Sequence, residues 1–232
     1  MNYSRQSGIF TPPDKPIHIV GCGATGSHAA FELAKAGCSL VLWDFDIVES
    51  HNLPNQMFMP TQVGMNKAEA LKEVLGMFNP LISITVHARA CKSSDLREVN
   101  GFIFLLVDSF KARHQLAKGL LFSKGNSWVI ETRMGVRELS CLVFRPKNPV
   151  HWKSWVASLG LDESTHREAS ACGTPLTIGA TAGVAARIAV WKFFDLLDSM
   201  NVAGRTDITL SLRQQALFPG ISPQSLSETL WD

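Results

Sequence analysis

Apolar positions near the start of the chain predict a strand, a helix and a second strand in close succession. Residues 17–20 form a short apolar run that a glycine ends. The next segment has small and apolar residues at helical spacing, namely Ala29, Ala30, Leu33 and Ala34. Gly37 stands just past this helix, where a glycine commonly ends one, and residues 40–43 form a second apolar run that stops at Asp44. The pattern therefore begins with a strand–helix–strand unit.

Further along the chain, helical and strand patterns keep alternating. We expect helices over residues 67–77, 109–118, 150–159 and 175–200, and a short helix that starts near residues 93–95. We expect strands over residues 81–86, 101–107, 127–132, 138–144 and 207–212. The unbroken apolar run of residues 101–107 is typical of a central parallel strand, whereas 127–132 and 138–144 pair as a hairpin. The chain is predicted to have an α/β fold with a Rossmann-like, doubly wound mixed sheet, in which parallel strands are followed by antiparallel strands.

Both ends of the chain are expected to lie outside one central domain. Residues 1–16 contain several prolines, which exclude regular structure, and are interpreted as an N-terminal arm. Residues 17–213 have the length of a single domain. Prolines and a glycine after residue 213 indicate an irregular C-terminal tail over residues 214–232.

A glycine-rich turn, residues 21–26, joins the first strand to its helix. The order of strand, glycine turn, helix, strand and acid is typical of a dinucleotide-binding fold. Gly21 permits a tight turn, Gly23 lets the backbone approach a phosphate, and Gly26 lets helix and strand pack closely, while the helix N-terminus attracts an anion. Asp44 could accept hydrogen bonds from ribose hydroxyls. The glycine pattern alone is also compatible with a packing turn that binds nothing.

Three short motifs after the second strand narrow the choice of nucleotide. They read Asp44-Phe45-Asp46-Ile47-Val48, Asn52-Leu53-Pro54-Asn55-Gln56 and Val63-Gly64-Met65-Asn66-Lys67-Ala68. This set resembles the ThiF/MoeB/HesA family of ubiquitin-activating-enzyme-like adenylyltransferases, whose pattern is D-x-D-x-V, N-L-x-R-Q and G-x-x-K-A. The resemblance covers residues 3–108 well and residues 128–197 loosely. An NAD dehydrogenase has no need of these polar residues, whereas asparagine, glutamine and lysine can hold the phosphates of ATP.

The resemblance implies an ATP-dependent enzyme with an adenylation domain over residues 17–213. Such an enzyme adenylates the C-terminal carboxylate of a small ubiquitin-like or sulfur-carrier protein that ends in Gly-Gly, and it releases pyrophosphate. The residues implied to bind ATP are Gly21, Gly23, Ala24, Thr25, Gly26, Asp44, Asp46, Asn52, Asn55, Gln56, Lys67, Asp108 and Ser109. Among these, Lys67 and Asp108 are also implied to be catalytic, and Asp108 is implied to hold Mg²⁺. The alternative for Asp108 is that it only caps the helix that follows.

Two further catalytic candidates are Arg5 and Cys172. Tyr3-Ser4-Arg5-Gln6 resembles the opening Y-x-R-Q of the family, which implies that Arg5 reaches the ATP of the partner in a homodimer; the alternative is a solvated arginine on a frayed terminus. Cys172 lies in a polar stretch where thioester-forming relatives carry a nucleophilic cysteine. Sulfur-transfer relatives instead carry a persulfide or disulfide there. The nearby Arg167 and the following helix N-terminus could lower the pKa of Cys172, and the alternative is an ordinary small residue before a helix.

Two residues leave the expected chemistry open. Arg133 follows a strand end, where it could hold a carboxylate or phosphate or be a surface charge of the hairpin. Asn55 stands where family members usually have an arginine, so one cation is missing from the phosphates. The chain is therefore also compatible with a catalytically weak nucleotide-binding subunit and, less well, with an NAD-dependent oxidoreductase.

Composition excludes several other classes. The 22 lysines and arginines nearly balance the 20 acidic residues, so no nucleic-acid-binding face is expected. Five scattered cysteines with no C-x-x-C pair predict no zinc site of the kind found in many relatives, and fit reduced thiols in the cytoplasm. No apolar run approaches the ~18 residues of a membrane span.

Overall fold

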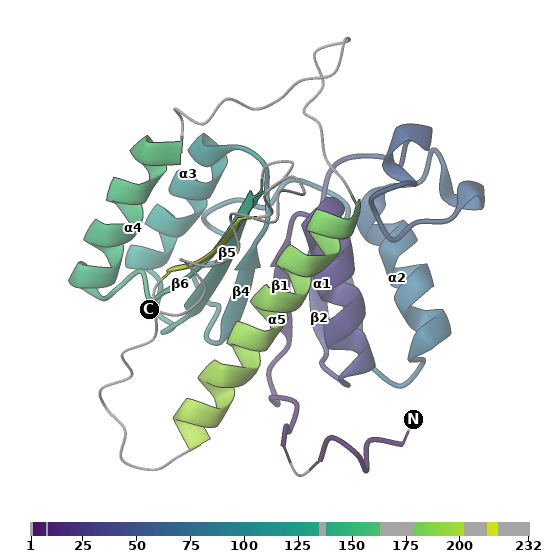
Figure 1. The fold of residues 1–232 in the computed structure, drawn as a ribbon, viewed down its shortest axis with the longest axis horizontal. Helices are drawn as coiled ribbons and strands as arrows, with labels where there is room; N and C mark the ends of the chain where they lie inside the picture. Colours follow the sequence, from purple (N-terminus) through teal and green to yellow (C-terminus); the bar gives the residue numbers. More distant parts are fainter. Residues whose placement is uncertain (1, 8, 135–137, 163–178, 202–212, 218–232) are drawn as a thin grey trace, which may run out of the picture.

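The computed structural model describes residues 2–7, 9–134, 138–162, 179–201 and 213–217 (Figure 1). Its strands and α-helices follow in the order β1 (Ile17–Val20), α1 (Ala24–Lys35), β2 (Leu40–Trp43), α2 (Lys67–Phe78), β3 (Ile84–His87), β4 (Phe102–Leu105), α3 (Phe110–Leu121), β5 (Trp128–Met134), β6 (Glu138–Phe144), α4 (Pro149–Asp162), α5 (Gly179–Asn201) and β7 (Arg213–Leu217). Two short 3₁₀ turns, Ser50–Asn52 and Pro60–Gln62, lie between β2 and α2.

The described strands form one mixed sheet in the order β3-β2-β1-β4-β5-β6-β7. The pairs β1–β2, β1–β4, β2–β3 and β4–β5 are parallel. The pairs β5–β6 and β6–β7 are antiparallel. The change from parallel to antiparallel pairing that the hairpin pattern predicted between residues 127–132 and 138–144 is therefore confirmed.

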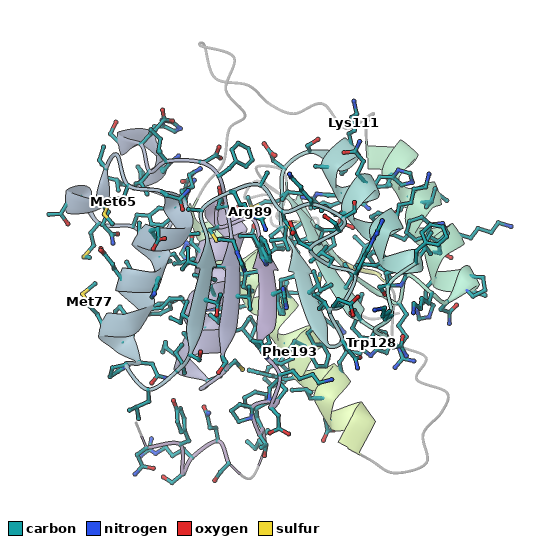
Figure 2. All side chains as sticks on the ribbon, turned by 180° about the vertical axis from the view of Figure 1, so that it is seen from behind. Met65, Met77, Arg89, Lys111, Trp128 and Phe193 are labelled. Carbon is teal, nitrogen blue, oxygen red and sulfur yellow. The ribbon has the colours of Figure 1, made fainter. Side chains whose placement is uncertain are left out.

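Helices cover both faces of the sheet, because the strands alternate their side chains between two cores. One core joins α1, α2 and α5 to one face of the sheet through residues such as Ile19, Leu33, Leu42, Leu71, Phe104 and Phe193. The other joins α3 and α4 to the opposite face through Val20, Ile103, Leu105, Leu116, Phe144 and Trp155. Over β2, this second face is covered partly by Arg89, whose guanidinium lies 5.0 Å from the centre of the Trp43 ring (Figure 2).

The sequence misplaced three elements. The short helix expected at residues 93–95 is a turn, in which the Asp95 carboxylate accepts hydrogen bonds from Arg89 and from the Lys92 backbone. The strand expected over residues 81–86 is β3, which begins at Ile84 and ends at His87. The tail expected to be irregular from residue 214 forms β7 up to Leu217, because the edge of β6 offers unpaired backbone groups. The strand expected over 207–212 lies outside the described residues.

The N-terminal arm packs against the domain at the end where α1 finishes. The Tyr3 hydroxyl accepts a hydrogen bond from Asn79 Nδ2 at 2.6 Å, and Gln6 Nε2 donates to the carbonyl of Ala36 at 2.9 Å. The Phe10 ring packs on Phe194 of α5, with 4.4 Å between ring centres. Among the described helices, none is both long and apolar enough to cross a bilayer.

Candidate nucleotide-binding site

The carboxyl ends of β1, β2 and β4 meet at one edge of the sheet. The Gly21 backbone N–H donates to the Trp43 carbonyl at 2.9 Å, and the Leu106 N–H donates to the Val20 carbonyl at 2.8 Å. Figure 2 shows Trp128, the first residue of β5, near the lower edge of the sheet and Lys111 of α3 near the upper edge. The residues that follow each parallel strand are therefore gathered at the upper edge.

The glycines of the turn differ in what surrounds them. Packing leaves no room for a side chain at two of them, whereas the third faces open space. A Cβ at Gly26 would lie 1.9 Å from the Gly21 carbonyl oxygen, and one at Gly21 would lie 2.8 Å from the Leu106 oxygen. Gly21 also has a φ of 97°, which favours glycine. A Cβ at Gly23 would meet nothing within 4 Å. The backbone at Gly23 is thus the part of the turn that a ligand could approach.

The α1 helix presents its N-terminus at this turn. Gly23 is the N-cap, no side chain caps the helix there, and its first turn, which contains Ala24 and Thr25, has no acidic residue. Uncapped N–H groups and the positive end of the helix dipole favour an anion at such a place. The turn therefore has the chemistry required to hold a phosphate group.

Asp44 ties the end of β2 to the glycine turn. Its Oδ2 accepts from the Cys22 backbone N–H at 2.6 Å and its Oδ1 accepts from the Asp46 N–H at 2.9 Å. Burial raises the pKa of Asp44 above its usual range, against the opposing effect of these two hydrogen bonds and of Lys67. Each oxygen keeps a second lone pair for a ribose hydroxyl. The sequence suggested only the ribose contact and missed this structural role.

Lys67 lies in an ion pair beside Asp44. Its Nζ is 3.2 Å from Asp46 Oδ2, and its side chain is 10% exposed, compared with 49% for Asp46. Asn66 fixes this geometry: its Oδ1 caps α2, while its Nδ2 donates to the carbonyls of Asp44 and Asp46. Lys67 is therefore a nearly buried cation at the same edge as the glycine turn.

The loop with Asn52, Asn55 and Gln56 lies against the first turn of α1, where the Met57 N–H donates to Ser27 Oγ, and against the start of α5. Asn52 Oδ1 accepts from the Glu49 backbone N–H at 2.9 Å, so only its Nδ2 remains for a phosphate oxygen. Gln56 Oε1 is buried and has no hydrogen-bond partner in the structure. A Cβ at Gly179 would come 3.2 Å from the Asn55 Cα, so α5 begins directly against this loop.

Asp108 and Ser109 follow β4. The N-cap of α3 is Ser109, whose Oγ accepts from the Ala112 N–H at 3.3 Å, while Asp108 precedes the cap and is exposed. Among the described residues, no group of three or more His, Cys, Asp or Glu side chains could form a metal cage. Mg²⁺ commonly takes one or two carboxylates together with nucleotide phosphates, so a single strand-end carboxylate fits this ion.

Comparison with known proteins assigns the chain to a family. The family model described as "ThiF family" matches residues 14–218, which is most of the chain. The chain belongs to the ThiF family. The resemblance to this family that the three motifs beginning at Asp44 indicated is therefore confirmed.

Individual relatives of this ThiF-family chain are distant. Ubiquitin-like modifier-activating enzyme 5 of Drosophila ananassae is 28% identical over 193 residues, which cover 73% of this chain and 48% of that protein. The chain thus spans about half the length of the curated relatives that it matches over most of its own length. E. coli MccB, solved with AMPCPP and MccA, is 21% identical with a TM-score of 0.65, covering 91% of this chain and 65% of that one. MccB solved with ATP is 22% identical with a TM-score of 0.60, covering 79% and 56%.

The structural likeness to MccB concerns the fold. The predicted α/β, Rossmann-like mixed sheet is confirmed by it and by the observed strand order.

Arg133 fits neither of the two interpretations that the sequence left open. Its side chain is 6% exposed, its Nε donates to Glu131 Oε1 at 2.8 Å, and its Nη1 donates to the Ser158 carbonyl at 2.9 Å. It is therefore a buried structural cation and not a surface charge. Burial alone would raise the pKa of Glu131, but the charges of Arg113 and Arg133 and a hydrogen bond from Trp155 lower it below its usual range. Charges two residues apart on one strand point to the same face, and this was the signal available in the sequence.

Arg5 lies at the opposite end of α1 from the glycine turn. It stands between Tyr3 and Gln6, which contact Asn79 and the Ala36 carbonyl. The 12 residues of α1 separate the two ends by roughly 18 Å. Figure 1 shows the N-terminus on the side away from the start of α1. Arg5 thus cannot contact a nucleotide on the glycine turn of its own chain.

Burial disfavours the thiolate form of the cysteines that the structure describes. Burial raises the pKa of Cys38, Cys91 and Cys141 to about 12 and that of Cys22 well above its usual value. A thiol must lose its proton to act as a nucleophile. Cys172 lies outside the described residues.

Proposed function

We propose that this chain binds ATP with Mg²⁺ and adenylates the C-terminal carboxylate of a small ubiquitin-like or sulfur-carrier protein that ends in Gly-Gly, with release of pyrophosphate. The observation that supports this most is the meeting of the glycine turn, the Asp46–Lys67 pair and Asp108 at the ends of β1, β2 and β4. Membership of an adenylating family supports it further, as does MccB, a neighbour in fold that was solved with ATP.

Each proposed binding residue has a distinct task. The Gly23 backbone and the first turn of α1 receive a phosphate, and Asp44 keeps the turn in shape while accepting a ribose hydroxyl. Lys67 neutralises phosphate charge, and Asp46 holds its ammonium in place before the nucleotide arrives. Nδ2 of Asn52 and the Gln56 amide add hydrogen bonds to the polyphosphate. The Ser109 hydroxyl is engaged as the cap of α3, which fixes the residue after Asp108.

Asp108 is the residue that would hold Mg²⁺. When bound, that ion supplies charge neutralisation at the phosphate oxygens. A carboxylate is a weak nucleophile, so the chain contributes chiefly by aligning the carrier terminus with the α-phosphorus and by offsetting charge. Because Lys67 is nearly buried, its charge is screened less by water than that of an exposed lysine.

For the step after adenylation, we propose Cys172 as the acceptor: its thiolate attacks the acyl carbon of the carrier adenylate, a thioester forms and AMP leaves. The cysteines at 22, 38, 91 and 141 have raised pKa values, which removes them as nucleophiles. Iodoacetamide at neutral pH should label Cys172 alone in the folded protein, and Cys172→Ser should abolish that label. Labelling of any of the other four cysteines in folded protein would contradict this assignment.

We also propose that the protein works as a cytoplasmic homodimer, in which Arg5 serves the nucleotide of the partner. The support is that Arg5 is remote from the site of its own chain, because α1 lies between them. Arg5 of the second chain would place a positive charge near the phosphates, where this chain has Asn55 instead of the arginine that is usual in the family.

A second candidate function is a catalytically weak nucleotide-binding subunit. Asn55, which sits against the start of α5 in place of the family arginine, favours it, since loss of a cation from the phosphates lowers phosphoryl-transfer rates. ATP–pyrophosphate exchange, measured with Gly-Gly-ended carrier proteins and with the same carriers lacking the last two residues, separates the two functions. Exchange that requires the Gly-Gly end is expected. Tight ATP·Mg²⁺ binding without exchange would favour the weak subunit, and tighter binding of NAD than of ATP in calorimetry would contradict both.

A further inference from the structure

A cluster of buried charges lies behind the turn that carries Asp108. Arg113 of α3 and Arg133 of β5 both contact the fully buried carboxylate of Glu131, at 2.5 and 2.8 Å. Trp155 of α4 also donates to this carboxylate, and the ring of Phe110 lies 5.6 Å and 5.4 Å from the two guanidinium groups. The cluster thus joins the first turn of α3 to β5 and α4.

Arg113 extends the cluster to the backbone next to Asp108. Its Nε donates to the carbonyl of Val107 at 2.6 Å, and its Nη1 donates to the carbonyl of Thr132 at 2.7 Å. Val107 precedes Asp108 directly and lies past the last residue of β4, Leu105. One nearly buried guanidinium therefore bridges the peptide before Asp108 to the end of the neighbouring strand.

Stability alone is a weak reason for such a cluster. Removing three charges from water is costly, and well-packed apolar side chains of similar volume commonly stabilise a protein as much or more. An apolar side chain, however, could not donate to the Val107 carbonyl. What the cluster provides beyond packing is a fixed hydrogen-bond donor for this one peptide group.

We propose that Arg113 is a positioning residue for Asp108: its bond to the Val107 carbonyl holds the backbone that carries the Asp108 carboxylate, and so sets the strength with which that carboxylate binds Mg²⁺. The inference rests on the proposed function, because it takes Asp108 as the Mg²⁺ residue. Glu131 acts one step further back, since it fixes the guanidinium of Arg113.

Arg133 provides a matched control. It has the same carboxylate partner, the same aromatic ring and a similar exposure, 6% compared with 8% for Arg113. It donates to Ser158 of α4 and not to the turn after β4. Arg113→Met and Arg133→Met each leave Glu131 with one arginine and change the net charge equally. Only the first removes the donor to Val107.

The test measures how ATP binding depends on Mg²⁺. Calorimetry gives the affinity of each protein for ATP without metal and across a Mg²⁺ titration, and urea unfolding gives its stability. Arg113→Met is expected to raise the Mg²⁺ concentration for half-maximal enhancement of ATP binding about tenfold, the lower end of the effect of residues that orient metal ligands. Its metal-free ATP affinity should stay within about twofold of wild type. Arg133→Met should leave the Mg²⁺ requirement unchanged.

Hydrogen exchange gives a reading without nucleotide or metal. The amides of residues 112 and 113, which donate to the Ser109 hydroxyl and carbonyl, should exchange faster in Arg113→Met than in Arg133→Met, whose effect should fall on α4. The inference would be overturned if the Mg²⁺ concentration for half-maximal enhancement rose equally in the two variants, or did not rise in Arg113→Met. Mg²⁺-dependent ATP binding by the wild type would in that case still support the proposed function. Wild-type ATP binding that does not respond to Mg²⁺ would overturn both. If Arg113→Met fails to fold, Arg113→Lys and Arg133→Lys are compared in the same way, with the same expected difference.

Discussion

At the residue scale, Asp44 combines an observed structural role with the role in nucleotide binding that is proposed for it. Its two carboxylate oxygens accept hydrogen bonds from the backbone N–H groups of Cys22, in the glycine turn, and of Asp46, in the loop after β2. From the order of elements, the sequence predicted that the acid at this strand end could bind a ribose. It could not predict the two backbone donors, because they depend on the path of the chain after β2.

Replacing Asp44 with alanine should therefore lower stability as well as nucleotide affinity. The buried N–H of Cys22 and that of Asp46 lose their acceptors, and each unsatisfied donor costs about 1–3 kcal/mol. Urea unfolding should show a loss of that order. The control is Asp46→Ala, whose half-exposed carboxylate should matter much less to stability. Equal losses in the two variants would contradict the role given to Asp44.

Two variants of the glycine turn distinguish a glycine that packing requires from one that is proposed to contact a phosphate. Gly26→Ala places a Cβ 1.9 Å from a carbonyl oxygen and should unfold the protein or destabilise it strongly. Gly23→Ala meets open space at a φ of −75°, so its melting temperature should stay close to wild type. Its ATP affinity should fall about tenfold, or ~1.4 kcal/mol, because the methyl group takes the place of a phosphate. Unchanged ATP affinity in stable Gly23→Ala would place the nucleotide elsewhere.

At the scale of elements, helices and strands with strong periodicity were predicted well and those without it were not. The expected helix over 67–77 is α2, capped by Asn66, and the expected strand over 138–144 is β6 with those bounds. β7, with the sequence Arg-Gln-Gln-Ala-Leu, has no alternating pattern and forms because β6 has an edge to fill. The charge cluster was missed for a similar reason, since α3, β5 and α4 must come together before Glu131 has partners.

Acid should weaken that cluster in a predictable direction. The pKa of Glu131 is lowered in the folded protein by its two arginines, so its contribution to stability is complete at neutral pH and is lost as pH falls below 4.5. At pH 7, Glu131→Gln leaves two buried arginines without a charge partner and should cost about 3–5 kcal/mol. The difference in free energy of unfolding between Glu131→Gln and wild type should become smaller as the pH falls. Urea unfolding across this range measures it, with Glu98→Gln, an exposed pair with Lys124, as a control expected to show no change. A gap that stays constant with pH would contradict a charged Glu131.

At the scale of the whole molecule, the N-terminal arm and the glycine turn lie at opposite ends of α1. The sequence could suggest that Arg5 acts on a second chain only through its family resemblance. In the structure the arm is fastened near Ala36 and Asn79, at the end of α1 away from the glycine turn of the same chain. Which residues of a partner would face Arg5 depends on a second copy of the chain, and a single sequence holds no direct signal for that contact.

Mixing two inactive variants tests the exchange of Arg5 between chains. Arg5→Ala and Asp108→Ala should each lose ATP–pyrophosphate exchange when alone. In a symmetric dimer with Arg5 in trans, a mixed dimer has one site with both defects and one with none. Random mixing should thus restore about a quarter of wild-type sites. No recovery, although mass spectrometry shows mixed dimers, would mean that Arg5 does not complete the partner's site.

The long helix α5 touches both of these distant regions. Its first residue, Gly179, abuts the Asn55 loop, and its Phe193 and Phe194 pack on Phe10 of the arm. These contacts are roughly 20 Å apart along one continuous helix, which behaves as a stiff rod. A subunit that docked on the arm and displaced Phe10 would remove a contact from one half of the helix whose first residue abuts the Asn55 loop. The arm and the Asn55 loop, which is proposed to lie beside the polyphosphate, are therefore attached to the two halves of one stiff element.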